Sequence, residues 1–285
     1  MTLAELNSDI IRRLTASLGD REGKATARLV MEDTLQADPT RIFTRGEYEL
    51  EPESVDRVNR IVGRIISGEP PQYAVGRARF MGLDLIVTPA TLIPRPETAA
   101  LVDMITDDYS GRTGLSILDI GTGSGCIAIA LSRALPFADI EGVDISDDAL
   151  AVARRNARML NVNVNFRHLD ILHAEPSAEP TYDIIVSNPP YIADSEKADM
   201  DKRVTDYEPA RALFVPDNDP LEFYRAIADF AASALNDGGR LYFEINPRYA
   251  SDLMTMLCKK GYSDVSVTRD YLGHERYARA TYNRQ

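Results

Sequence analysis

The sequence predicts an α/β fold with a small helical domain in front of it. From residue 98 onward, apolar segments of strand length alternate with segments of helical periodicity, as the units of a parallel sheet do. The first 68 residues repeat apolar side chains at helical spacing instead, beginning with Leu3, Leu6, Ile10 and Leu14. A chain of 285 residues is long enough for two domains, one of them with a substantial core.

Three regions are therefore expected. Residues 1–69 form an N-terminal helical domain, whose last helix covers residues 53–68 and ends at Gly68, before Pro70 and Pro71. Residues 70–97 form a linker that contains a β-hairpin over residues 80–87, with Gly82 near its turn. Residues 98–285 form the larger α/β domain.

The elements of the larger domain follow in order along the chain. Helices are expected over residues 98–107, 126–135 and 221–235. Strands are expected over 115–120, 139–143, 165–169, 182–187 and 240–245, with a turn at 237–239 and a final pair of β segments around 265–282. Polar or glycine-rich loops follow several of these strands, and they carry the candidate site.

The first such loop follows the strand over residues 115–120 and consists of Gly121, Thr122, Gly123, Ser124 and Gly125. Glycines at a strand-to-helix junction let the backbone approach a ligand closely, while the helix N-terminus presents unpaired N–H groups. The next strand ends at Asp144, whose carboxylate could hold a ribose diol. Because Gly123, Gly125 and Ala128 also satisfy the relaxed dinucleotide fingerprint, this loop alone could belong to a dehydrogenase.

The most informative loop is Asn188-Pro189-Pro190-Tyr191, directly after the strand over residues 182–187. The two prolines have no N–H and restrict the backbone, so the loop is stiff and offers the Asn188 side-chain oxygen and the Pro189 carbonyl as acceptors. Tyr191 adds a flat apolar face. An amino group on an sp² carbon would fit, with one hydrogen on each acceptor.

A simpler interpretation of the loop is a rigid turn, since Pro-Pro after Asn is ordinary turn chemistry. The whole tetrapeptide directly after a buried strand favours a functional role. A hydride-transfer enzyme needs no paired acceptors there, so this loop also decides against the dehydrogenase interpretation.

Taken together, the glycine loop, Asp144 and the Asn-Pro-Pro-Tyr loop resemble the class I S-adenosylmethionine-dependent methyltransferases that modify exocyclic or amide nitrogens. That resemblance implies a Rossmann-like sheet with helices on both faces and S-adenosyl-L-methionine as the cofactor. It also implies that residues 121–125 surround the methionine end, that Asp144 binds the ribose, and that Asp170 and Ile171 lie near the adenine, with Asn188 also near the cofactor. Asp170 could equally be a turn or cap residue.

The linker points to a narrower family. Its segments 70–76 (Pro-Pro-Gln-Tyr-Ala-Val-Gly) and 92–98 (Leu-Ile-Pro-Arg-Pro-Glu-Thr) resemble the protein-glutamine N5-methyltransferases that act on class-1 peptide release factors. Residues 207–214 and 270–276 match that family as well. The run Glu244-Ile245-Asn246-Pro247 departs from it, since the family usually has a glycine and then a glutamine nearby. Arg95 and Glu97 are either a structural ion pair or cap, or part of the substrate channel.

This resemblance implies a function for the chain and a separate role for each of its two domains. The methyltransferase domain transfers a methyl group to the glutamine of the Gly-Gly-Gln motif, which supports translation termination, and the helical domain binds the release factor. Asn188 and Pro189 are the expected catalytic residues, and residues 188–191 are the expected substrate-binding residues. Two alternatives stay open, an adenine-N6 or other nucleic-acid amino methyltransferase and a non-catalytic adaptor.

Composition and charge limit the partners. The net charge is −12, and both the helical region and the remainder are acidic, so free duplex DNA is a poor partner. No apolar run has the length of a membrane span and no signal peptide is present, so we expect a cytoplasmic protein. The three histidines and two cysteines show no metal-binding spacing, and we expect no metal. We expect a monomer.

Overall fold

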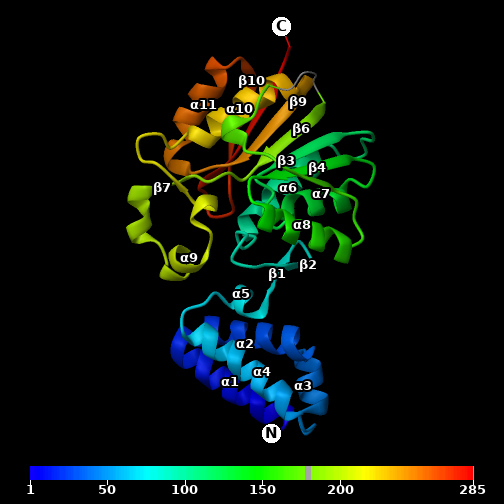
Figure 1. The fold of residues 1–285 in the computed structure, drawn as a ribbon, viewed down its shortest axis with the longest axis vertical. Helices are drawn as coiled ribbons and strands as arrows, with labels where there is room; N and C mark the ends of the chain where they lie inside the picture. The colour runs from blue at the N-terminus through cyan, green and yellow to red at the C-terminus, as the bar shows by residue number, and fades with distance from the viewer. Residues whose placement is uncertain (177–180, 285) are drawn as a thin grey trace. The chain divides into compact units, whose positions relative to one another are not determined.

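The computed structural model describes residues 1–176 and 181–284 (Figure 1). The chain folds as two compact units. The first consists of Met1–Arg77 together with Asp201–Tyr207, and the second of Ala78–Met200 together with Glu208–Gln285. The sequence analysis did not anticipate that residues 201–207 pack with the first unit.

The first unit is built from helices. They are α1 (Leu3–Leu18), α2 (Asp20–Leu35), α3 (Pro39–Arg45), α4 (Pro52–Ile66), α5 (Pro71–Val75) and α9 (Lys202–Tyr207). Leu6, Ile10 and Leu14 of α1 are fully buried in its core, as their helical spacing predicted. In α9, Arg203 forms an ion pair with Glu22 of α2.

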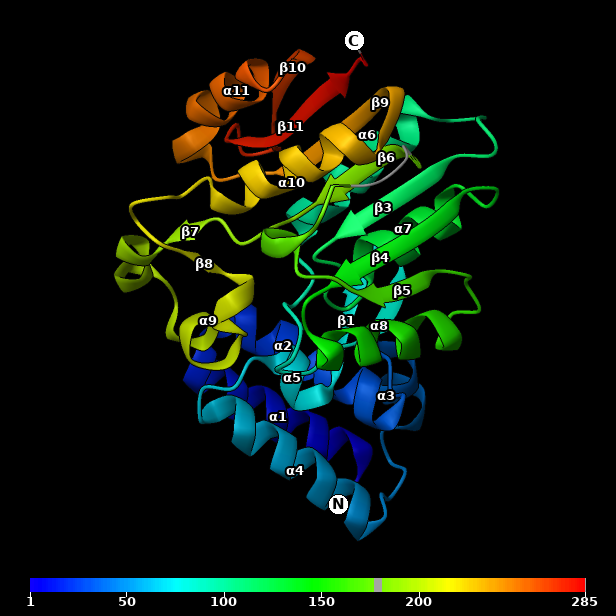
Figure 2. The same ribbon diagram turned by 45° about the horizontal axis from the view of Figure 1, so that its top comes forward.

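The second unit contains a seven-stranded sheet within the described residues (Figure 2). Its strands, in spatial order, are β10 (Tyr262–Arg269), β11 (Glu275–Tyr282), β9 (Leu235–Glu244), β6 (Tyr182–Ser187), β3 (Ser116–Ile120), β4 (Asp139–Asp144) and β5 (Asn165–His168). The strands β9, β6, β3, β4 and β5 run parallel, and β11 is antiparallel to both of its neighbours. This confirms the predicted α/β fold.

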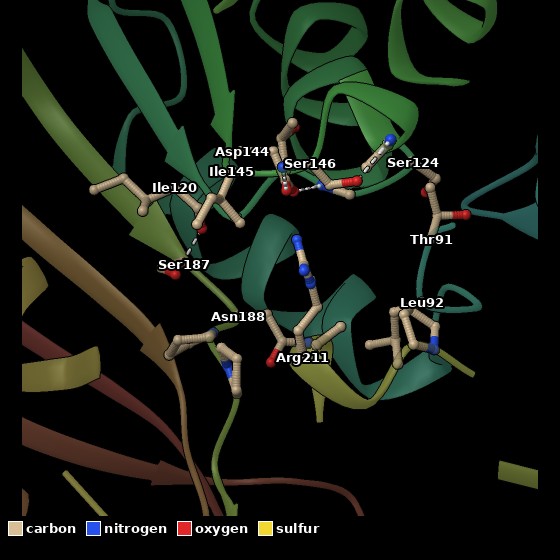
Figure 3. A pocket seen from close by; sticks show the side chains of 18 of the residues that line it. Thr91, Leu92, Ile120, Ser124, Asp144, Ile145, Ser146, Ser187, Asn188 and Arg211 are labelled. Atoms are coloured by element: carbon tan, nitrogen blue, oxygen red, sulfur yellow. Dashed lines mark hydrogen bonds between the residues drawn. The ribbon is translucent and has the colours of Figure 1, made fainter. Parts of the chain in front are cut away.

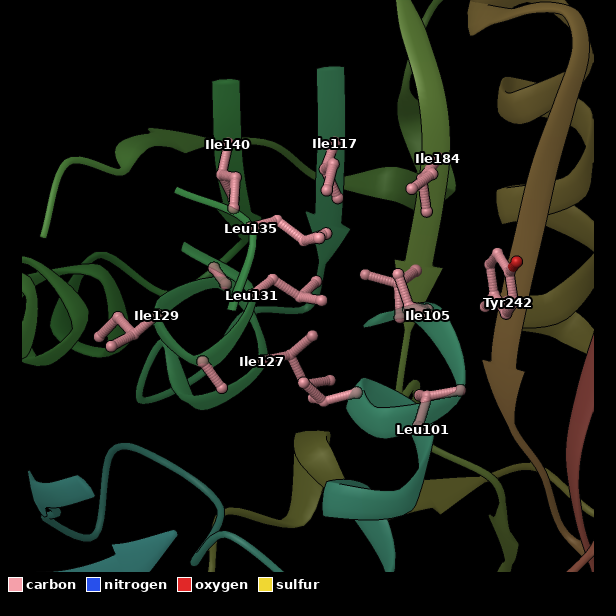
Figure 4. Close-up of a cluster of buried hydrophobic side chains, with 14 of the residues drawn as sticks. Leu101, Ile105, Ile117, Ile127, Ile129, Leu131, Leu135, Ile140, Ile184 and Tyr242 are labelled. Atoms are coloured by element: carbon pink, nitrogen blue, oxygen red, sulfur yellow. The ribbon is translucent and has the colours of Figure 1, made fainter. Parts of the chain in front are cut away.

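Helices cover both faces of the sheet. One face packs against α6 (Pro96–Asp108), α7 (Cys126–Ala134) and α8 (Asp147–Met159), and the other against α10 (Glu222–Ala234) and α11 (Ala250–Lys259). Successive strand residues point to opposite faces. Ile117 and Ile184 therefore join the first core (Figure 4), while Leu118 and Ile185 join the second.

Shorter elements complete the second unit, and one expected turn is wrong. The predicted hairpin is present with its turn near Gly82, but its first strand, β1 (Arg77–Phe80), begins before the expected range of 80–87; its second strand is β2 (Leu83–Ile86). The remaining short elements are η1 (Ile171–His173), β7 (Ile192–Ala193), η2 (Asp194–Asp199), η3 (Ala210–Ala212), β8 (Phe214–Val215) and η4 (Pro247–Tyr249). The expected turn at residues 237–239 lies inside β9, because Leu235 already pairs with Tyr182 and Gly239 pairs with Tyr282. The chain forms an irregularity in the ladder there rather than reversing its direction.

The order of the strands determines where a ligand can bind. From β3 the chain proceeds outward through β4 and β5, and then returns to place β6 on the other side of β3. In open α/β sheets, ligands bind beyond the carboxyl ends of the strands at such a switch point. None of the described helices is both long and apolar enough to cross a membrane.

Candidate active site

A cavity of about 360 Å³ lies at this edge of the sheet (Figure 3). The loops after β3, β4 and β6 line it, together with residues of the linker, η1 and η3. Of the residues predicted from the sequence, those that line the cavity are Gly121, Thr122, Gly123, Ser124, Asp144, Asp170, Ile171, Asn188, Pro189 and Pro190. Gly125 and Tyr191 are not among its lining residues.

The glycine loop follows β3, and its glycines differ in role. Gly123 has a φ of +55°, and an added Cβ would have only the Gly121 carbonyl oxygen within 4 Å, at 3.9 Å, so its backbone faces open space at the cavity. At Gly125, with a φ of +82°, an added Cβ would come within 3.0 Å of Ile129 and 3.3 Å of Phe166. Gly125 therefore permits close packing beneath the loop, and a direct cofactor contact for it stays a prediction.

The backbone N–H groups of this loop are mostly bonded within the protein. Those of Gly121 and Thr122 both donate to the Val143 carbonyl, at 2.8 and 2.9 Å. Those of Gly123 and Gly125 donate to Asp144 Oδ2 and to the Thr122 carbonyl. Short strand-to-helix loops satisfy their own donors in this way, so fewer of them remain for a ligand.

Asp144 ends β4, and the surrounding backbone fixes its carboxylate. Its Oδ2 accepts the Gly123 N–H and its Oδ1 accepts the Ser146 N–H, each at 2.9 Å. Burial raises the pKa of Asp144, and these two hydrogen bonds and the positive charge of Arg211 oppose that rise. Because each carboxylate oxygen has a further lone pair, Asp144 can still accept hydrogen bonds from ribose hydroxyls.

Two buried polar atoms beside the loop have no partner within the described residues. One is Ser124 Oγ, on a residue that lines the cavity, and the other is Asp119 Oδ1. Asp119 Oδ2 accepts hydrogen bonds from Thr122 Oγ1 at 2.7 Å and from the Ala128 N–H at 3.2 Å, yet burial raises the pKa of Asp119 to about 7. The free Ser124 hydroxyl, the open glycine backbone and Asp144 form a donor and acceptor set that fits the amino-acid and ribose parts of S-adenosylmethionine.

Asp170 is a cap residue at the cavity, and its contact with the adenine stays a prediction. It lines the cavity together with Ile171, and its Oδ1 also caps η1 by accepting the Leu172 N–H at 3.1 Å. Its other oxygen lies 2.8 Å from His173 Nδ1. The cap holds the start of η1, and with it Ile171, at the cavity wall.

Asn188 lies directly after β6, which is anchored to β3 by a hydrogen bond from Ser187 Oγ to the Ile120 carbonyl at 2.7 Å. The Asn188 Nδ2 group donates to Thr98 Oγ1 at 3.3 Å. Asn188 Oδ1 and the Pro189 carbonyl have no bonded donor in the part of the chain that the structure describes. Two acceptors of the expected kind are thus available beside the cavity.

A buried hydrogen-bond network supports this loop, and the sequence analysis missed it. Glu244, at the end of β9, accepts from Thr98 Oγ1 at 2.7 Å and from the Tyr191 hydroxyl at 3.1 Å. Burial raises the pKa of Glu244, and these hydrogen bonds and the charge of Arg276 oppose the rise. Tyr191 therefore points to Glu244, and its substrate-binding role stays a prediction.

Asn246, in the segment that departs from the family pattern, also supports the loop. Its Nδ2 donates to the Tyr191 carbonyl at 3.0 Å, and the residue is buried. A residue that differs from the family pattern, Asn246, thus contributes a contact to the Asn-Pro-Pro-Tyr loop. Only the adjacency of residues 244–247 to a buried strand could have signalled this from the sequence.

Arg95 forms an ion pair with Glu208, not with Glu97, and it also lines the cavity. Glu208 Oε2 accepts the Ile93 N–H at 3.1 Å, and its side chain is only 1% exposed. The ion pair therefore connects two of the segments that resemble the family, residues 92–98 of the linker and residues 207–214. Arg211 of the second motif was not predicted as a site residue, although it lines the cavity.

Comparison with protein families and known proteins agrees with this site. Residues 96–206 match the family model described as methyltransferase small domain, and residues 9–76 match the one described as PrmC N-terminal domain. A release factor glutamine methyltransferase of Bacteroides thetaiotaomicron is 45% identical over 90% of this chain and 91% of its own length. One of Flavobacterium psychrophilum is 35% identical over 99% of this chain and 100% of its own length.

Solved structures agree on the fold. A methyltransferase from Pyrococcus furiosus superposes with a TM-score of 0.52 at 21% identity, over 78% of this chain and 98% of that one. The two relatives extend over nearly the whole sequence, helical region included. The chain therefore belongs to the release factor glutamine methyltransferase family.

Proposed function

We propose that this chain transfers a methyl group from S-adenosyl-L-methionine to the side-chain amide nitrogen, N5, of the glutamine in the Gly-Gly-Gln motif of class-1 peptide chain release factors. The observation that carries the proposal is the pair of unbonded acceptors, Asn188 Oδ1 and the Pro189 carbonyl, beside a glycine loop and a strand-end carboxylate. The named relatives support the choice of a glutamine amide over other amino groups.

The cofactor contacts follow from the residues that line the cavity. The glycine loop and Ser124 would hold the amino-acid part, Asp144 the ribose, and Asp170 with Ile171 the adenine. When bound, S-adenosylmethionine supplies an electrophilic methyl group on a sulfonium. A glycine backbone without side chains leaves room for this ligand next to Asn188.

The difficulty of the reaction lies in the substrate. A glutamine amide nitrogen shares its lone pair with the carbonyl, which makes it a weak nucleophile. If Asn188 Oδ1 and the Pro189 carbonyl each accept one amide hydrogen, they fix the plane and direction of the nitrogen. They also stabilise the positive charge that grows on nitrogen in the transition state.

Asn188 can perform this role in only one orientation of its amide. Its Nδ2 group donates to Thr98, which leaves Oδ1 to face the substrate. Thr98 in turn donates to the buried Glu244, so the direction of this chain of hydrogen bonds is set by the carboxylate. Neither Asn188 nor Pro189 is titratable, and the amide proton is expected to leave after the transfer, to water or to a carbonyl.

The remaining features of the proposal concern partners and location. We propose that the helical domain, residues 1–69, binds the release factor, that residues 98–285 carry out the transfer, and that the enzyme acts as a cytoplasmic monomer in support of translation termination. A net charge of −12 supports a protein partner over free duplex DNA and disfavours an adenine-N6 methyltransferase.

The test is transfer of a labelled methyl group from S-adenosylmethionine to a purified class-1 release factor. The same factor with its Gly-Gly-Gln glutamine changed to alanine, and duplex DNA, serve as the other acceptors. Label on the intact factor alone is expected. Label on DNA, or equal label on the alanine variant, would contradict the proposed substrate.

A further inference from the structure

The charged residues around the cavity are few. Among the described residues, Arg95 and Arg211 are the basic side chains that line it, and Asp144 and Asp170 are the acidic ones. Arg95 is already neutralised by its ion pair with the buried Glu208. One positive charge, that of Arg211, is therefore left to face a ligand.

Arg211 differs from Arg95 in its surroundings. It belongs to η3, it is exposed, and within residues 1–176 and 181–284 its guanidinium forms no hydrogen bond or ion pair. Figure 3 shows the side chain extending into the cavity, between Asn188 and the side where Asp144 and Ser146 lie. Leu213 fixes the base of η3, because it is buried and its carbonyl accepts the Ile192 N–H at 2.9 Å.

The cofactor brings a carboxylate that needs a partner at the end of its amino-acid tail. The glycine loop has few donors left for this carboxylate, because the N–H groups of Gly121, Thr122, Gly123 and Gly125 already donate to protein acceptors. A carboxylate placed in a cavity with Asp144 and Asp170 would also be repelled unless a cation lies close. A guanidinium matches a carboxylate through two parallel hydrogen bonds.

We propose that Arg211 binds the carboxylate of the amino-acid tail of S-adenosylmethionine and so selects ligands that carry this group. The inference rests on the proposed function in so far as the cavity is the cofactor site. It adds a residue of η3, outside the glycine loop, to the side chains that recognise the cofactor. Arg211 touches the end of the tail away from the methyl group, so it determines affinity for the cofactor.

The test compares two ligands that differ only in this carboxylate. S-adenosylhomocysteine carries it, and 5′-deoxy-5′-(3-aminopropylthio)adenosine, its decarboxylated analogue, does not. Dissociation constants for both are measured by isothermal titration calorimetry on wild type, Arg211→Gln and Arg211→Lys, without release factor. Arg133→Gln is the matched control, because Arg133 is an exposed arginine of α7 that does not line the cavity.

We expect Arg211→Gln to weaken S-adenosylhomocysteine binding about tenfold, equivalent to about 1.4 kcal/mol, and to leave the decarboxylated ligand unaffected. Arg211→Lys should retain part of the preference for the carboxylate, and Arg133→Gln should retain all of it. An equal loss for both ligands would overturn the inference, since Arg211 would then act on the adenosine part or through Asp144. No loss for either ligand would overturn it as well.

The design separates this inference from the proposed function. A wild-type chain that binds neither ligand would refute the cofactor assignment itself. A chain that binds S-adenosylhomocysteine through Arg211 but does not methylate a release factor would refute only the substrate. The expected selectivity does not depend on which protein is methylated.

Discussion

Thr98→Val tests whether the buried network orients Asn188. The Thr98 hydroxyl accepts from Asn188 Nδ2 at 3.3 Å and donates to Glu244 Oε2 at 2.7 Å. Valine keeps nearly the same shape but can do neither. The Asn188 amide then loses the acceptor that distinguishes its two ends, and in the flipped orientation Nδ2 would face the hydrogens of the substrate amide.

The magnitudes follow from these two hydrogen bonds. The hydrogen bond between Asn188 and Thr98 is long and joins two neutral groups. Its loss should reduce the free energy that favours the active orientation of the Asn188 amide by about 1 kcal/mol, and so lower kcat about fivefold. Glu244 is 2% exposed and loses a donor, which should lower the free energy of unfolding by about 2 kcal/mol. Thr98→Ser keeps the hydroxyl and should restore both quantities in large part.

The assay measures kcat and KM for the release factor, together with urea unfolding and the dissociation constant for S-adenosylhomocysteine. A reduced kcat with cofactor affinity close to that of wild type is expected. If Thr98→Val loses stability but keeps the wild-type kcat, Thr98 is structural only and the orienting role is refuted. The same holds if Thr98→Ser is as slow as Thr98→Val.

Three further predictions follow from the site. Asn188→Ala should lower the methylation rate by about 10²–10³, the usual cost of one lost transition-state hydrogen bond, while S-adenosylhomocysteine affinity changes little; a parallel fall in affinity, measured by calorimetry, would count against the role. Asp144→Asn should weaken S-adenosylhomocysteine binding about ten- to a hundredfold, and an unchanged dissociation constant would contradict the ribose contact. The pKa of Asp119 rises on folding from 3.8 to about 7, so its contribution to stability is complete below pH ~4 and is lost as the pH rises through about 7. The stability of wild type relative to Asp119→Asn should therefore fall by at most about 4 kcal/mol between pH 4 and pH 8 in urea unfolding, and a difference independent of pH would contradict the shift.

Much of the fold and the centre of the site could be predicted because their signals are local. β6 has the apolar run Ile184–Val186 shortly before Asn188, and β4 is a short segment with buried Ile140 and Val143 that ends at Asp144. Parallel strands bring their carboxyl ends to one edge of the sheet. The fold class alone therefore predicts that residues that follow different strands meet at this edge. Periodicity also indicated that the first unit is helical, and it located α4, but it did not locate α3, α5 or α9.

The supporting residues could not be predicted in the same way. Thr98 and Glu244 are 146 residues apart, and no spacing rule connects a helix start to the end of a distant strand. Arg95 and Glu208 belong to two motifs that were both noticed, yet their pairing depends on the three-dimensional path of the chain. The turn expected at residues 237–239 failed because the buried Leu235 already pairs with Tyr182, which local glycine content does not reveal.

The central claim is that Asn188 Oδ1 and the Pro189 carbonyl receive the two hydrogens of a glutamine amide. A crystal structure of this chain with S-adenosylhomocysteine and a Gly-Gly-Gln peptide tests it most directly. The account predicts that the glutamine Nε2 lies within hydrogen-bond distance of both oxygens. A glutamine amide that contacts neither oxygen, with the cofactor product bound in the cavity, would contradict the account.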